Sequence, residues 1–235
     1  MLKLKKRLVV LTGSGISSES GIRTFREAGG MWEDHDVTEV ATPMAWIRDQ
    51  EMVLRFYNER RKQLLDCEPN RGHLGLVELE KYFDVRIITQ NVDDLHERAG
   101  SSSVLHLHGE LKKARSTVDE SLVYDIEGWE LKTGDRCEKG SQLRPHIVWF
   151  GEAVPAMEEA ARLSTTADIF VVIGTSLVVY PAASLVGYAP PEASMWLIDP
   201  NDIVVPYNRK VEVIREKAAT GIDILIPRLL ERYGK

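Results

Sequence analysis

The chain has 235 residues, 43% of them hydrophobic and 28% charged, with a formal net charge of −6 at pH 7. This is the composition of a globular protein large enough to bury a full core. The negative charge gives no electrostatic footprint for nucleic acid or an anionic membrane, and no apolar run is long enough for a membrane span or a signal segment. We therefore expect a cytoplasmic protein that binds neither; the oligomeric state stays open.

Short β-branched runs alternate with helical stretches along the chain. They predict strands at residues 7–12, 85–89, 169–173, 195–198 and 211–214. Alternating strands and helices predict an α/β fold, a parallel sheet covered on both faces. The last apolar stripe, from Ile222 to Tyr233, predicts a helix.

Polar or glycine-rich residues follow the strands, at Gly13-Ser14-Gly15, Gln90-Asn91, Gly174-Thr175-Ser176 and Asp199. Ligands of parallel sheets bind beyond the carboxyl ends of the strands, so these loops predict a nucleotide cleft. Ser17 to Glu19 can begin a helix whose free amides would hold a pyrophosphate. Ser18 stands where the usual dinucleotide pattern has its third glycine, so a tight strand-to-helix turn is the alternative.

Two stretches, approximately residues 29–66 and 112–145, do not fit the alternation. We expect them to form a smaller module packed on the sheet. The two cysteines, Cys67 and Cys137, lie too far apart for a CxxC pair, so neither a disulfide framework nor a cysteine zinc site is predicted.

Five segments resemble the sirtuin family, in the family's order. They are LTGSGISSESGIRTFR at residues 11–26, TQNVDDLHERAG from Thr89, HLHGEL from His106, PHIVWFGE from Pro145 and GTSLVVYPAA from Gly174. The resemblance covers nearly the whole chain. It implies one catalytic domain over residues 1–235, with a Rossmann-like large domain and a small domain formed by the two insertions. It also implies that NAD is consumed as a co-substrate and that acylated-lysine proteins or peptides are the partners.

The family's chemistry implies roles for individual residues. Sirtuins cleave the nicotinamide–ribose bond of NAD and transfer the acyl group to ADP-ribose. His108 matches the histidine that acts as general base, and an imidazole suits this work because its pKa lies near the working pH. His106 is expected to be a packed core residue instead. The residues that match NAD-binding positions are Gly13, Ser14, Gly15, Ile16, Thr24, Phe25, Arg26, Trp32, Gln90, Asn91, Asp93, Gly174, Thr175, Ser176, Asp199 and Ala218.

Within that set, Gln90, Asn91 and Asp93 match the positions that hold the nicotinamide ribose and carboxamide, and Ile16 would wall the nicotinamide pocket. Ala218 or Ala219 would lie near the adenine.

Two further groups of residues match substrate positions. Val148, Phe150 and Gly151 resemble the strand on which the substrate peptide adds as an extra strand. Tyr57 and Arg60 are three residues apart on a predicted helix and share one face. They resemble the Tyr-x-x-Arg pair of the sirtuins that remove malonyl and succinyl groups, in which the arginine binds the distal carboxylate.

The chain departs from the family at the zinc site. Most sirtuins hold a structural zinc on four cysteines, whereas Ser116 stands at the first position and Cys137 is the only thiol of this stretch. One thiolate cannot complete a tetrahedral site, so no zinc is expected. Packing is expected to hold the small domain together, through Leu122, Tyr124, Ile126, Trp129 and Leu131.

Three functions therefore compete. The first is an NAD-dependent protein-lysine deacylase that accepts acidic acyl groups. The second is an NAD glycohydrolase or ADP-ribosyltransferase on the same fold, against which the Tyr57/Arg60 pair argues. The third is a non-catalytic NAD-binding module, against which the intact His108 motif argues.

Overall fold

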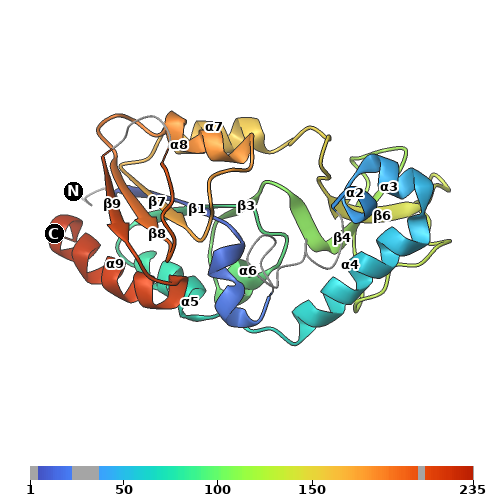
Figure 1. Ribbon diagram of the computed structural model, residues 1–235, viewed down its shortest axis with the longest axis horizontal. Coiled ribbons are helices and arrows are strands. Elements are labelled where there is room, and N and C mark those ends of the chain that lie inside the picture. Colours follow the sequence, from blue (N-terminus) through green and yellow to red (C-terminus); the bar gives the residue numbers. More distant parts are fainter. Residues whose placement is uncertain (1–4, 23–36, 206–209, 235) are drawn as a thin grey trace.

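The computed structural model describes residues 5–22, 37–205 and 210–234, which form a large and a small lobe (Figure 1). The large lobe contains a six-stranded, wholly parallel sheet in the order β3-β2-β1-β7-β8-β9. Its strands are β1 (Arg7–Thr12), β2 (Asp84–Thr89), β3 (Val104–His106), β7 (Ile169–Ile173), β8 (Ser194–Ile198) and β9 (Val211–Ile214). The five predicted strands are confirmed, and β3 is an additional edge strand.

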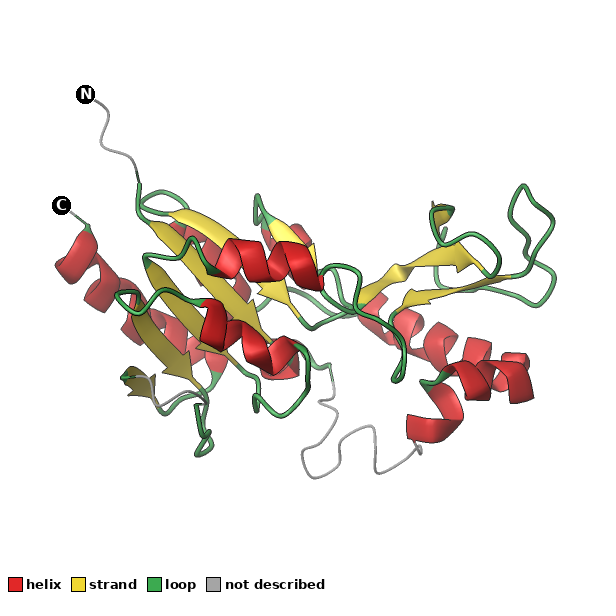
Figure 2. Ribbon diagram, turned by 90° about the horizontal axis from the view of Figure 1, so that it is seen from above, coloured by secondary structure: helices red, strands yellow, loops and turns green. Residues whose placement is uncertain are grey.

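Side chains alternate between the two faces of this sheet, as the period of a strand requires. Leu8 and Val10 of β1 belong to the core on one face, and Val9 and Leu11 to the core on the other. Helices α5 (Arg71–Leu79) and α9 (Ala218–Tyr233) cover the first face, and α7 (Met157–Ser164) and α8 (Leu185–Tyr188) the second (Figure 2). The predicted sheet with helices on both faces is thus confirmed.

The small lobe joins three helices to a three-stranded antiparallel sheet. The helices are α2 (Val37–Val40), α3 (Pro43–Arg48) and α4 (Gln50–Leu65), and the sheet has the order β5-β4-β6, with β4 at Gly109–Ser116, β5 at Val123–Asp125 and β6 at Leu143–Ile147. The short helix α6 (Leu95–Ala99) lies between β2 and β3 along the chain, and η3 (Ala182–Ser184) precedes α8.

Apolar packing joins the elements of the small lobe. Leu131 is buried in its core, and Leu122, Tyr124 and Ile126 pack against that core. Trp129 differs from the prediction because its side chain remains 37% exposed, with the Lys62 ammonium 5.5 Å from its ring centroid.

The segment after β1 differs from the prediction of a phosphate-binding helix. Two 3₁₀ turns follow β1, η1 (Ser14–Ile16) and η2 (Ser18–Ser20). The amides of Ile16 and Ser17 donate to the carbonyls of Gly13 and Ser14, so the tight turns themselves satisfy them. A row of free amides at a helix N-terminus is therefore not formed here. Within the described ranges, no helix combines the length and the apolar character needed to cross a bilayer.

Leu225 tests the core on the α9 face of the sheet. Its side chain is fully buried, so Leu225→Ala should lower the free energy of unfolding by about 2–5 kcal/mol through lost burial and the cavity that remains. Leu65→Ala is the matched control: this leucine is 48% exposed, and we expect a change within about 0.5 kcal/mol. Denaturant titrations measure both. Equal losses in the two variants would contradict this assignment of the core.

Candidate functional site

A cavity of about 790 Å³ lies where the carboxyl ends of the large-lobe strands face the small lobe. The loops after β1, β2, β7 and β8 all contribute to its wall, as the sequence predicts. The predicted site residues on the wall are Gly13, Ser14, Gly15, Tyr57, Arg60, Gln90, Asn91, His108, Val148, Phe150, Gly151, Gly174, Thr175, Ser176, Asp199 and Ala218.

The loops after β1 and β7 touch backbone to backbone at the centre of the sheet. The Gly15 amide donates to the Gly174 carbonyl at 2.9 Å. A Cβ on Gly15 would lie 2.7 Å from the Gly174 Cα, and a Cβ on Gly174, whose φ is +61°, would lie 2.5 Å from the Ile16 nitrogen. Both positions therefore require glycine, and the absence of side chains leaves room for a ligand along this edge.

A buried polar network holds the loop after β2. The Asn91 side-chain amide donates to the Ser17 hydroxyl at 3.0 Å, and Ser17 donates to Asp93 at 3.0 Å. The Gln90 side-chain amide reaches across to the Thr175 hydroxyl at 2.9 Å. Burial raises the pKa of Asp93, although the Leu95 amide and the Ser17 hydroxyl stabilise its charged form. The network fixes Gln90 and Asn91 at the cavity wall.

Two of the predicted residues lie behind the wall. Asp93 is buried and contacts the site through Ser17. Ile16 is fully buried in the core between β1, α5 and α9, so its side chain packs inward and is not part of the described wall. The prediction that Ile16 walls the nicotinamide pocket does not match this placement, because the tight turn of η1 directs the side chain into the core.

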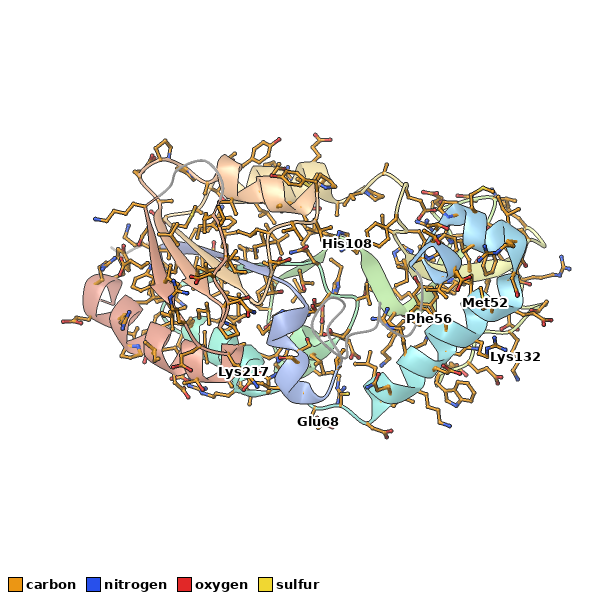
Figure 3. All side chains as sticks on the ribbon, viewed as in Figure 1. Met52, Phe56, Glu68, His108, Lys132 and Lys217 are labelled. Atoms are coloured by element: carbon orange, nitrogen blue, oxygen red, sulfur yellow. The ribbon has the colours of Figure 1, made fainter. Side chains whose placement is uncertain are left out.

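His108 follows β3, and its hydrogen bond defines which tautomer the ring adopts. Its Nδ1 lies 3.0 Å from the Gln90 carbonyl oxygen. A carbonyl only accepts, so Nδ1 carries the proton and Nε2 keeps its lone pair. Burial lowers the pKa of His108, although the Gln90 carbonyl opposes this. The ring is therefore neutral at pH 7 and able to accept a proton. Figure 3 shows His108 between the two lobes.

His106 lies two residues earlier and differs from the expected packed core residue. Its Nδ1 lies 2.9 Å from the Asn91 carbonyl oxygen and its Nε2 2.9 Å from the Glu97 carboxylate. Burial alone would lower the pKa of His106, but the Glu97 carboxylate raises it above its usual value. A protonated ring donates to both acceptors, so His106 ties the loop after β2 to α6.

The small lobe contributes Tyr57 and Arg60, one helical turn apart on α4. Both line the cavity, which confirms that they share a face. Tyr57 is 2% exposed, and its hydroxyl accepts a hydrogen bond from Trp149 Nε1 at 3.0 Å. Burial raises the pKa of Tyr57 to about 12, although the Arg60 charge opposes this. Burial also lowers the pKa of Arg60, but a guanidinium stays charged at neutral pH.

The segment from Val148 to Gly151 leaves β6 without regular structure and turns at Phe150 and Gly151, so the prediction of a strand there is wrong. Strand β6 ends at Ile147. The Val148 amide then donates to the His108 carbonyl, the Trp149 amide to the Glu152 carboxylate and the Phe150 amide to the Ala41 carbonyl. The Trp149 amide bonds to a side chain, and the Trp149 carbonyl accepts from the Glu152 amide at 3.0 Å in a turn, so the strand does not continue through this segment. The segment still lies on the cavity wall.

Comparisons with known proteins agree with this geometry. Residues 13–181 match the model of the Sir2 family. The chain belongs to the Sir2 family. An NAD-dependent protein deacylase of Bacteroides thetaiotaomicron is 54% identical to this Sir2-family chain, with 94% of this chain and 99% of that protein covered. One from Helicobacter pylori is 53% identical, with 96% and 98% covered.

Solved structures of Sir2 proteins also superpose on this chain. A Sir2 homologue in complex with NAD has a TM-score of 0.87 and 38% identity, with 97% of this chain and 91% of that chain covered. A mutant Sir2 homologue in complex with ADP-ribose has a TM-score of 0.89 and 38% identity, with 98% and 94% covered.

Some predicted residues of this Sir2-family chain lie outside the described residues, namely Thr24, Phe25, Arg26 and Trp32. Others on the cavity wall were not predicted. Lys217 immediately precedes α9, and Figure 3 shows it on the large lobe. Asn201 donates from its backbone and side chain to Asp199. Neither residue belongs to a motif, but each lies within two residues of a predicted site residue, Ala218 or Asp199.

The stretch in which the sequence predicts the loss of the zinc cysteines holds a small hydrogen-bonded cluster. The Ser116 and Ser141 hydroxyls lie 2.9 Å apart, and the Cys137 thiol lies 3.3 Å and 3.2 Å from them. The two hydroxyls lower the pKa of Cys137 to about 7. Across the described ranges, no group of three or more His, Cys, Asp or Glu side chains is placed to hold a metal ion.

This cluster leads to a prediction about metal content. The purified protein should contain no stoichiometric zinc, because two hydroxyls and one thiol are a poor ligand set for this ion. Elemental analysis measures the zinc content, and a thermal melt with and without a chelator measures its effect on stability. One tightly held zinc per chain, or a chelator-induced fall in melting temperature, would contradict the prediction.

Proposed function

We propose that this Sir2-family chain removes succinyl and malonyl groups, as well as acetyl groups, from protein lysines. The general activity, NAD-dependent protein deacylation, follows from the family and from NAD-dependent protein deacylases that match nearly the whole length of this chain. The observation that supports removal of succinyl and malonyl groups is the placement of Tyr57 and Arg60 on the cavity wall. A guanidinium and a phenol in a partly dry cavity suit a carboxylate.

The cavity suits NAD in its shape and its donors. The glycine contact between Gly15 and Gly174 keeps the centre of the sheet edge free of side chains, and Asp199 and Ala218 line the end formed by β8 and α9. Gln90 and Asn91, which follow β2 on the other side of β1 from β7, also line the wall. When bound, NAD supplies the ribose carbon that receives the acyl group as nicotinamide is released, giving acylated ADP-ribose.

We assign proton transfer to His108. Its Nε2 lone pair can take a proton from a ribose hydroxyl, while its Nδ1–H keeps its hydrogen bond to the Gln90 carbonyl. That carbonyl also stabilises the imidazolium that forms, because it accepts from the ring in either state. The base therefore keeps one orientation through the transfer.

We place the acyl-lysine peptide along Val148, Phe150 and Gly151, with its acyl group directed toward Arg60 and Tyr57. The amides of Val148 and Phe150 already donate within the chain. The turn would therefore recognise a peptide backbone through its carbonyl oxygens, with the half-exposed Phe150 side chain beside it. We also propose that residues 1–235 form one catalytic domain, whose small lobe comes from insertions at approximately 29–66 and 112–145.

Removing the base should abolish the chemistry while leaving the fold. His108→Ala should lower kcat/KM for deacylation by about 10²–10⁴-fold or more, the usual contribution of a general base. The unfolding midpoint should change little. Nicotinamide release by the wild type without any acylated peptide would instead support an NAD glycohydrolase. Full deacylase activity in the variant would remove His108 from the mechanism.

The pH profile gives an independent check on this base. The neutral form of His108 is active, and burial lowers its folded-state pKa below the usual value of about 6.5. Activity should therefore stay level as the pH falls to about 6.5 and decline only below it, as the ring gains its proton. The measurement is kcat/KM against pH with one acyl peptide. A decline that begins above pH 7 would contradict the assigned protonation state.

Arg60 and Tyr57 test the acyl preference. Arg60→Met would leave a succinyl carboxylate buried and unpaired, at a cost of roughly 3–5 kcal/mol, whereas an acetyl group has no carboxylate. Desuccinylation should therefore fall far more than deacetylation, and Tyr57→Phe should act in the same direction more weakly. The measurement is kcat/KM on matched acetyl and succinyl peptides.

Arg55→Met is the matched control for this experiment, because Arg55 is an exposed arginine on the same helix. We expect it to leave the ratio of the two activities unchanged. Equal losses on the two peptides in Arg60→Met would show that Arg60 serves the fold or NAD, and the acidic-acyl proposal would be withdrawn.

A further inference from the structure

The hydroxyl of Tyr57 has an unusual environment for a group on a cavity wall. Among the described residues its one hydrogen-bonding partner is the indole N–H of Trp149, at 3.0 Å. Both side chains are only 2% exposed, so this bond is shielded from water. Tyr57 lies on α4 and Trp149 in the turn after β6, so the bond joins the acyl-binding helix to the proposed peptide-binding segment.

The direction of this bond decides where the phenol proton points. An indole N–H can only donate, so the Tyr57 oxygen must accept. A phenol O–H stays close to the plane of its ring and therefore has two favoured directions. The Trp149 N–H occupies one side of the oxygen, which leaves the other for the proton. Tyr57 is thereby held as a donor for a group inside the cavity.

Trp149 is itself held in place by charged neighbours. The Arg144 guanidinium lies 3.2 Å from the centroid of the Trp149 ring, and Glu152 accepts both from the Trp149 amide at 2.8 Å and from Arg144 at 2.6 Å. A cation over the ring draws electron density toward itself, which strengthens the indole N–H as a donor. Glu152 neutralises that cation, so the stacked pair is not an unpaired buried charge.

We propose that Trp149 is a specificity-positioning residue, which holds the Tyr57 hydroxyl as a dedicated hydrogen-bond donor to the distal carboxylate of an acidic acyl-lysine. This inference rests on the proposed preference for acidic acyl groups. A carboxylate beside Arg60 accepts the directed proton in a charge-assisted bond. The methyl group of an acetyl-lysine offers no acceptor, so the same fixed proton gains nothing there. Trp149 acts through Tyr57 and need not touch the acyl group.

The first test variant removes the indole N–H together with one ring of the side chain. In Trp149→Phe the Tyr57 hydroxyl can rotate freely, so the ratio of kcat/KM for succinyl over acetyl peptide should fall by roughly 3-fold to 10-fold, the value of one neutral hydrogen bond. In a Tyr57→Phe background the same substitution should leave the ratio unchanged, because no phenol proton remains to be directed. This double-mutant cycle separates the bond from general packing.

Trp46→Phe is the matched control. Trp46 is a second buried tryptophan of the same core, with its ring centroid 5.8 Å from that of Trp149. It should lower stability like any core truncation and leave the succinyl-to-acetyl ratio alone. If Trp149→Phe does not fold, as shown by its denaturation curve, 3-benzothienylalanine at position 149 replaces only the N–H by sulfur and should lower the ratio in the same way.

Two results overturn the inference in distinguishable ways. In the first, the wild type removes succinyl groups, but Trp149→Phe lowers both activities equally or still changes the ratio in the Tyr57→Phe background. Trp149 then serves packing alone. A wild type that removes acetyl but not succinyl or malonyl groups withdraws the proposed acyl preference, and the role of Trp149 with it.

Discussion

The site depends on the close approach of two backbones at the centre of the large sheet. Strands β1 and β7 are parallel neighbours, and the connections run to opposite sides from this point, so the loops after them part and leave a crevice. Gly15 and Gly174 close the floor of that crevice with a direct amide-to-carbonyl bond. A side chain at either glycine would push the loops apart and misplace Gln90, which reaches Thr175 across this floor.

A second constraint operates in the small lobe, where a buried ion pair between Arg144 and Glu152 fixes the turn after β6. Burial would raise the pKa of Glu152, but the guanidinium of Arg144 and the Trp149 amide hold it below its usual value. Such a buried ion pair adds little stability compared with apolar packing, and its value lies in the geometry it enforces. Here it directs the chain out of β6, brings Trp149 against Tyr57 and leaves Phe150 half-exposed at the cavity. The ion pair thus orients Trp149 and Phe150, at the segment where we propose that the substrate binds, and adds little stability.

The sequence predicts the large lobe well because its strands are buried on both faces and therefore read as apolar runs. It misses β3, because three half-buried residues after a serine-rich turn carry no pattern. It also misses β4, in which the consecutive lysines Lys112 and Lys113 interrupt any alternation of apolar and polar residues. It errs at Val148 for the opposite reason. A β-branched and aromatic run favours a strand, but the amides there find partners in three separate segments, which only the tertiary structure reveals. Many wall residues were predicted from motifs, whereas Lys217 belongs to no motif and only the fold shows that it reaches the cavity.

The two histidines of the HLHG segment show how neighbours assign different roles to one residue type. His106 and His108 are two residues apart, and their Nδ1 atoms contact the consecutive carbonyls of Asn91 and Gln90. Both rings therefore donate from Nδ1 to a backbone carbonyl, and they differ in the partner of Nε2. In His106 it meets Glu97, which favours the charged ring and makes it a fixed tie between β3 and α6. In His108 burial favours the neutral ring, so its Nε2 keeps the lone pair that a base requires. A carboxylate in contact with His108 would raise its pKa and favour the loss of that lone pair. Glu97 contacts His106 instead, and among the described residues the groups that shift the pKa of His108 include no carboxylate.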